Sequence, residues 1–183
     1  MKKLYYGENI NSYNENSCQE LAWAIEASFG EFSLILVRCN YANLRENTVQ
    51  QLREICAFEI RKVHLCESEK TLYSTIKNNL GNEEPLAVMV FGLESVIAIE
   101  KLLTATNSVR EEFRNNFPFP LVLWINDDIL QKLIRLAPDF ETWSTTIEFV
   151  ISDNELIDLI QETADDIFAK LLDFGAGLFL DNA

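Results

Sequence analysis

Residues 120–136 read PLVLWINDDILQKLIRL, and this stretch decides the fold because a strand pattern turns directly into a helix pattern within it. Every residue at positions 121–125 is apolar, which is typical of a parallel strand covered on both faces. Asp128 and Gln131 follow at the spacing of a helix capping box, and Pro138 marks where the helix should end. The stretch therefore predicts one strand–helix unit of an α/β protein.

The same unit recurs along the chain on both sides of this stretch. Short apolar runs begin at Ser33, Ile60, Leu86, Leu121 and Thr146, separated by 27, 26, 35 and 25 residues. These separations are close to the roughly 30 residues of a βαβ unit. The last run alternates polar and apolar residues, which favours a place near the sheet edge. The sequence thus predicts an α/β three-layer sandwich, a mostly parallel five-stranded sheet with helices on both faces.

Helix signals lie between these runs and set the expected domain organisation. Helices are expected to begin at Ser17, Asn43, Ser68, Asp128 and Ser152, and one long helix is expected between Ile99 and Phe113. Gly81 is a natural stop for the third helix. We therefore expect a polar N-terminal segment (1–17), an α/β domain (18–152) and an acidic C-terminal helix and tail (153–183).

Composition excludes several classes of function. The 183 residues include 15 basic and 29 acidic side chains, a net charge of −14, which disfavours binding to nucleic acids and to anionic membranes. No apolar run approaches the roughly 20 residues that cross a bilayer, so we expect a soluble, cytoplasmic protein. The four cysteines form no C-x-x-C pair, which indicates free thiols rather than a zinc site.

Negative charge is concentrated at the end of the chain. Residues 139–183 hold 11 acidic side chains and one basic side chain. This face is typical either of a solvated helix surface or of a docking surface for a protein partner. The residues expected to bind a partner are Asp158, Glu162, Asp165, Asp166, Leu178, Phe179 and Leu180.

The motifs of common nucleotide-binding and hydrolytic sites are missing. None of the six glycines follows the first strand, where the sequence reads RCNYANLREN, and neither G-x-x-x-x-G-K-[ST] nor G-x-G-x-x-G occurs. The chain also lacks the G-x-S-x-G nucleophile elbow. His64 and Cys66 stand two residues apart on one strand, which fits a packed strand histidine better than a catalytic dyad. We therefore expect no cofactor.

Carboxylates at predicted strand ends leave one catalytic alternative open. Glu94, Asp127 and Asp128 could hold Mg²⁺ for phosphoryl transfer or nuclease chemistry, together with Asp153 if the strand order permits. Three of these four acids precede predicted helices, where a carboxylate ordinarily caps free amides.

Four blocks of the sequence, in this order, resemble one family. They are EFSLILVRCN (31–40), PLAVMVFGLES (85–95), FPFPLVLWINDDILQKLIRLAPDFETW (117–143) and TTIEFVIS (145–152). Together residues 18–152 resemble the degenerate P-loop-NTPase-like modules of bacterial multidomain proteins, the inactive STAND-type modules that have lost the phosphate-binding loop. The resemblance makes Glu94 the nearest equivalent of the magnesium-binding acid and Asn126 that of the γ-phosphate sensor.

The resemblance implies a pseudo-NTPase scaffold for regulated assembly in bacterial signalling or anti-phage conflict. The expected function is a non-catalytic protein-interaction module whose partners are other proteins, downstream repeat or effector domains, or a second copy of the chain. The alternative is a Mg²⁺-dependent phosphoryl-transfer or nuclease domain. A nucleotide-binding switch without a phosphate loop is a third possibility.

Overall fold

The computed structural model describes residues 8–152 without a break and, after them, residues 154–157, 160–161, 163–164, 167–168 and 170. One compact unit spans Tyr13–Val150, and the residues before and after it form a second unit. The first unit contains the whole sheet and is described here first.

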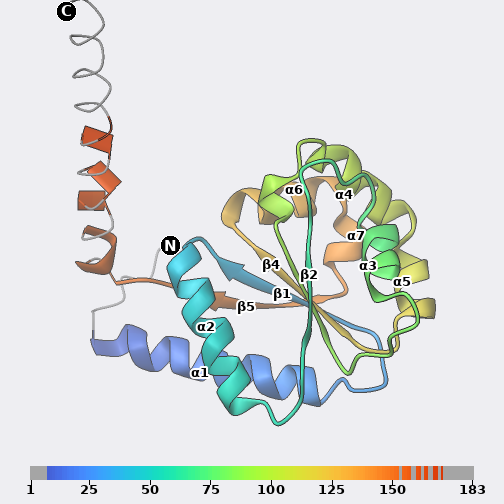
Figure 1. The fold of residues 1–183 in the computed structure, drawn as a ribbon, viewed down its shortest axis with the longest axis horizontal. Coiled ribbons are helices and arrows are strands. Elements are labelled where there is room, and N and C mark those ends of the chain that lie inside the picture. The colour runs from blue at the N-terminus through green and yellow to red at the C-terminus, as the bar shows by residue number, and fades with distance from the viewer. Residues whose placement is uncertain are drawn as a thin grey trace, which may run out of the picture. The chain divides into compact units, whose positions relative to one another are not determined.

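Strands and helices alternate along the chain, as Figure 1 shows. In order they are α1 (Glu8–Glu26), β1 (Ser33–Cys39), α2 (Ala42–Ile55), β2 (Arg61–His64), α3 (Leu72–Leu80), β3 (Val88–Phe91), the 3₁₀ turn η1 (Leu93–Ser95), α4 (Ile99–Ser108), α5 (Arg110–Asn116), β4 (Pro120–Ile125), α6 (Asp127–Leu136), α7 (Pro138–Glu141) and β5 (Ser144–Phe149). Each of the five predicted strands is present.

The five strands form one parallel sheet in the order β2-β3-β4-β1-β5. The two apolar strands β1 and β4 lie side by side inside the sheet, with Leu34 opposite Leu121. β5 is an edge strand, as its alternating sequence predicts. The predicted α/β class and three-layer arrangement are confirmed.

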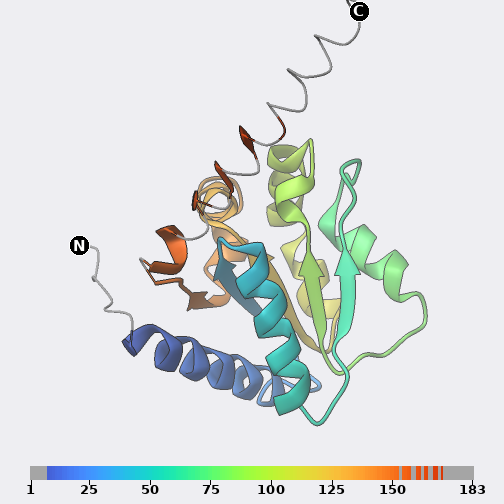
Figure 2. The same cartoon turned by 60° about the vertical axis from the view of Figure 1, so that its left-hand side comes forward.

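The strand order explains which helices cover which face. From β1 the chain passes β4 and β3 to reach β2, and from β2 onward it moves in the opposite direction across the sheet. Because crossover connections between parallel strands are right-handed, a reversal of direction places the connecting helices on the opposite face. α2 therefore lies on one face and α3 on the other (Figure 2).

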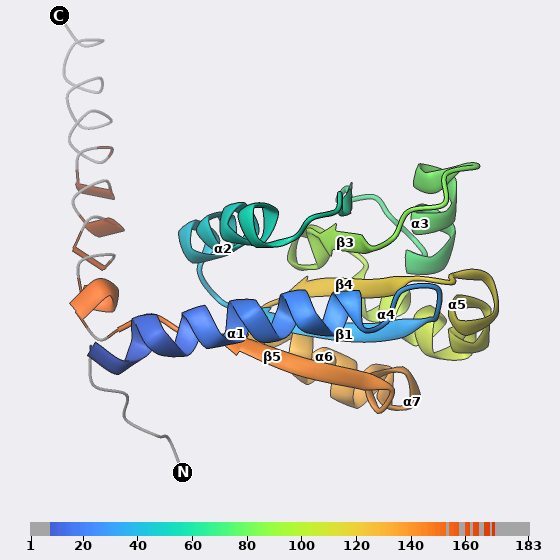
Figure 3. The same ribbon diagram turned by 90° about the horizontal axis from the view of Figure 1, so that it is seen from below.

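The two faces carry two separate cores, and β1 contributes to both by alternation. Ile35 and Val37 pack with the buried side of α1 and α2, whereas Leu34 and Leu36 pack with α3, α4, α5, α6 and α7. Figure 3 shows α1 running along β1. The strand pattern of uninterrupted apolar residues thus reflects burial on both faces.

The N-terminal helix begins earlier than the sequence suggests. α1 starts at Glu8, so the expectation that Ser17 opens this helix is wrong, and the segment assigned to positions 1–17 is helical from residue 8. The helix is amphipathic, because Ser17, Cys18, Leu21 and Ile25 lie on one buried side. Asn14 fixes the same helix to the end of β5: its side chain donates to Val150 O at 2.7 Å and accepts from Val150 N at 3.1 Å.

Other helix boundaries also differ from the expectations. α2 begins after Tyr41 and α3 after Thr71, both without a side-chain cap, so Asn43 and Ser68 do not open these helices. The long helix expected between Ile99 and Phe113 is divided into α4 and α5 at Val109. Gly81 ends α3 with a positive φ of 56°, as predicted.

The second unit contains helical residues after Ser152. Ser152 Oγ accepts from the Glu155 N–H at 3.1 Å, and Glu155 Oε2 accepts from the Ser152 N–H at 2.8 Å. This reciprocal capping box confirms the predicted helix start. In the part of the chain that the structure describes, no helix combines the length and the apolar character needed to span a bilayer.

Candidate functional site

The neighbouring strands β1 and β4 mark a reversal in the direction of the connections. The chain leaves β1 toward β2 at one edge of the sheet, and it leaves β4 toward β5 at the other edge. These neighbouring strands lead into helices on opposite faces, β1 into α2 and β4 into α6. In open parallel sheets ligands bind at such a reversal, outside the carboxyl ends of the strands. We call the residues that end or follow β1, β3 and β4 at this edge the switch point.

Arg38, near the end of β1, is held by two carboxylates. Its Nε donates to Asp127 Oδ1 at the start of α6, and its Nη1 donates to Glu148 Oε1 at 2.8 Å. Glu148 is the direct partner of Arg38 in the register of β1 and β5, so strand pairing itself places this acid. The hydrogen bond to Asp127 raises the pKa of Arg38 despite burial, and the charge of Glu148 adds to it. The guanidinium is therefore engaged by the protein's own acids.

Side chains of the same chain also bind the first amides of α6. The Asp127 N–H donates to Asn40 Oδ1 at 2.9 Å, and the Ile129 N–H donates to Asn126 Oδ1 at 2.9 Å. Free amides at a helix N-terminus are the groups that hold phosphate oxygens in nucleotide-binding proteins. Here two are occupied, and the acids Asp127 and Asp128 in the first turn repel an anion.

An ion pair links α2 to η1 at the same edge. Arg45 Nη1 donates to Glu94 Oε1 at 2.6 Å, and the two side chains are 25% and 29% exposed. A partly exposed pair contributes about 0–1 kcal/mol to stability, so its main effect is on position. The pair holds Glu94, the nearest equivalent of the magnesium-binding acid, against an arginine.

The glycine of this region serves packing. Gly92 follows β3 with a φ of 87°, and a Cβ at this position would lie 3.0 Å from Leu65 O. The turn into η1 therefore needs glycine in order to pass the end of β2. The β1–α2 turn has no glycine, in agreement with the missing phosphate loop.

The structure does not bring the three candidate carboxylates together with one another. Each bonds to a different cation: Glu94 to Arg45, Asp127 to Arg38, and Asp128 to Lys132 one helical turn later at 2.6 Å. Among the described residues, no group of three or more His, Cys, Asp or Glu side chains is placed to hold a metal ion.

The cap of α6 is Asn126, and the expectation that Asp128 has this role is wrong. The resemblance makes Asn126 the nearest equivalent of the phosphate sensor. Its side-chain oxygen accepts a hydrogen bond from the Ile129 N–H of α6. Sequence reasoning also missed Arg38 and Glu148. A signal was present, because a single charged residue inside an apolar strand run usually needs a partner of opposite charge.

The residues expected to bind a partner, Asp158, Glu162, Asp165, Asp166, Leu178, Phe179 and Leu180, lie outside the described residues. Four described residues of the same helical stretch are apolar and exposed. Ile157, Ile160 and Ile167 are 51%, 59% and 53% exposed, and Phe168 is 66% exposed. No family model matches the chain, and no curated protein sequence matches it either.

Proposed function

We propose that this chain is a non-catalytic α/β module that assembles with other protein chains. One observation carries the proposal: at the switch point Arg38, Asn40 and Glu94 are all bound by groups of the same chain. Binding and catalytic sites direct polar groups toward a substrate. Here these groups connect β1, η1 and α6 to their neighbours.

The resemblance to inactive STAND-type modules fits this proposal. Glu94, the nearest equivalent of the magnesium-binding acid of active relatives, is paired with Arg45. Asn126, the nearest equivalent of the phosphate sensor, caps α6. In this proposal the sheet is a scaffold whose former nucleotide positions now stabilise the fold. All four cysteines are free thiols, which supports a reducing, cytoplasmic location.

The proposed contact surface is an apolar seam on the helical residues after Ser152. Ile157, Ile160, Ala164 and Ile167 are spaced by 3, 4 and 3 residues, the spacing of the two core positions of a coiled-coil heptad. In the sequence Leu171, Phe174 and Leu178 continue this spacing beyond the described residues. We call these seven positions the heptad seam.

The distribution of charge favours a second copy of the same helix as the partner. None of the acids between positions 154 and 178 stands at a core position of the heptad or at the e and g positions beside the core. These acids are Glu155, Asp158, Glu162, Asp165, Asp166 and Asp173. Two copies can therefore pair with their acids on the outside. The remaining repulsion between two acidic chains is screened by salt.

Sedimentation equilibrium of the full chain tests this contact. We expect self-association that strengthens as salt concentration rises, because screening weakens repulsion between the acidic outer faces. Ile160→Glu and Ile167→Glu place a charge in the seam and should give a monomer. Ala169→Glu adds the same charge at an outer heptad position and should leave association intact.

Two results would count against the proposal. A wild-type chain that stays monomeric at every salt concentration contradicts pairing through a second copy. A Mg²⁺-dependent nuclease or phosphatase activity that Glu94→Ala abolishes contradicts the non-catalytic part and supports the metal-dependent alternative.

A further inference from the structure

A hollow lies between α2 and the edge strand β2, and its larger part reaches the Arg45–Glu94 ion pair of the switch point. Two adjoining cavities of about 410 and 480 Å³ share Val49, Arg53 and Lys62 in their linings. Val49 packs in the same core as Met89 and Phe91 of β3. α2 therefore covers β3 and leaves the adjacent face of β2 open. We call the two cavities together the α2–β2 hollow.

Two cations line the shared middle of this hollow without an acidic partner. Arg53 belongs to the last turn of α2, and Lys62 belongs to β2. Five other arginines pair with carboxylates. Arg53 and Lys62, like Arg114 and Lys101, make no ion pair with any residue that the structure describes. Burial, followed by the charge of Arg53, lowers the pKa of the Lys62 amine.

Arg53 and Lys62 together line one hollow, and the charge of Arg53 acts on Lys62, in a chain whose net charge is −14. Because acids are abundant, a carboxylate could have been placed beside Lys62 by many substitutions. Two like charges near one another on a partly buried surface oppose folding unless an anion comes between them. The repulsion between these two cations therefore lowers the stability of the free chain, and a bound anion removes it.

A stacked pair of aromatic rings lines the same cavity as the two cations. The His64 ring stacks on Phe91, with ring centroids 5.0 Å apart and planes 15° apart. His64 is exposed and lines the larger cavity together with Gln50. A planar group could therefore stack on His64 while its charged end reaches the cations.

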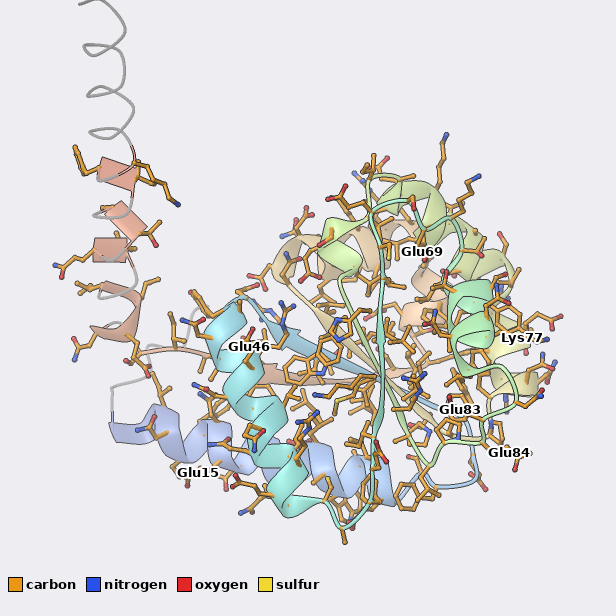
Figure 4. The ribbon with its side chains drawn as sticks, in the orientation of Figure 1. Glu15, Glu46, Glu69, Lys77, Glu83 and Glu84 are labelled. Carbon is orange, nitrogen blue, oxygen red and sulfur yellow. The ribbon has the colours of Figure 1, made fainter. Side chains whose placement is uncertain are left out.

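The acids around the hollow leave its middle free. Glu94 is occupied by Arg45. Glu46, labelled on α2 in Figure 4, precedes Arg53 by two turns of this helix, roughly 10 Å. It lines only the larger cavity. Glu59 lines only the smaller cavity. An anionic group between Arg53 and Lys62 therefore avoids all three carboxylates.

We propose that the α2–β2 hollow binds a small organic phosphate, with its phosphate between Arg53 and Lys62 and a planar ring against His64. A phosphate dianion accepts hydrogen bonds from the guanidinium fork of arginine and from a lysine ammonium group. The hollow has the volume of a small-molecule site. This proposal is independent of the heptad seam.

Calorimetry of the full chain in magnesium-free buffer tests the site with three probes. AMP carries phosphate and ring, ribose 5-phosphate carries phosphate alone, and adenosine carries the ring alone. We expect AMP to bind best, ribose 5-phosphate more weakly, and adenosine not measurably. Lys62→Met should weaken AMP binding about tenfold or more, since a hydrogen bond to a charged group is lost. Lys101→Met removes the same charge from α4 and should change nothing.

Contrary results are equally definite. AMP that fails to saturate the protein at millimolar concentration, or that binds Lys62→Met and Lys101→Met equally, overturns the site. Adenosine binding as well as AMP contradicts the phosphate contact, and ribose 5-phosphate binding as well as AMP contradicts the ring contact. Lys62→Met removes a repulsion and should not lower the melting temperature, so lost binding is distinguishable from lost folding.

Discussion

The switch point and the α2–β2 hollow contain similar residues and differ in what their charges contact. At the switch point Arg38 lies between Asp127 and Glu148. In the hollow Arg53 lies near Lys62, and no described acid pairs with either. In our proposals the first region needs no ligand, whereas the second binds an anion. The comparison therefore tests whether the partners of charged groups predict binding better than a place in a known topology does.

The largest effect is expected at Gly92, which lines the hollow and leads into Glu94 of the switch point. Gly92→Ala should lower the free energy of unfolding by about 2 kcal/mol, because left-handed backbone disfavours a side chain and the new Cβ would meet Leu65 O at 3.0 Å. Gly30→Ala is the matched control: its φ is 81°, with no atom within 4 Å of the added Cβ. Chemical denaturation should show the smaller loss, about 1 kcal/mol, at Gly30.

Removing one arginine from each region separates the two directly. Arg38→Met leaves Asp127 and Glu148 without their shared cation and should lower stability by about 1 kcal/mol, a modest value because the pairs are partly exposed. Arg53→Met relieves repulsion with Lys62 and should change stability by less than about 0.5 kcal/mol. Urea denaturation of both variants measures the difference. Equal losses would mean that Arg53 has a stabilising partner.

The smallest effect is a pH dependence of the hollow. The pKa of Lys62 is below its ordinary value of 10.5 in the folded chain, so the unfolded chain holds this proton more firmly. Its charge therefore opposes folding at neutral pH, and the opposition disappears as pH rises toward 10.5. Lys62→Gln should raise the melting temperature at pH 7, and the gain should shrink at higher pH. A gain that grows with pH would contradict this sign.

Strand positions were predictable because burial on both faces leaves a direct mark on sequence. β1 begins at Ser33, where the first predicted run begins, and β5 lies at the predicted edge. The order of the remaining strands was not predictable, because every interior run is similarly apolar. Predictions of helix starts were wrong where two side chains of suitable type stood close together in the sequence. In α6 the cap is Asn126 and not Asp128.

The candidate sites were less predictable than the fold. The missing phosphate loop was visible as the lack of glycine after β1, but the partners of Glu94 and Asp127 come from α2 and β1, far away in sequence. Arg53 of α2 and Lys62 of β2 line one hollow only in the folded chain. Neither residue stands out in sequence, since a single cation on a helix or a short strand is ordinary.

The most direct test of the central claim is a calorimetric titration with ATP, with and without Mg²⁺, of the wild type, Glu94→Gln and Lys62→Met. If the switch point is complete without a ligand, magnesium should not strengthen binding, and Glu94→Gln should behave as the wild type does. Any weak binding should disappear in Lys62→Met. Micromolar, magnesium-dependent binding that is lost in Glu94→Gln and kept in Lys62→Met would contradict the claim.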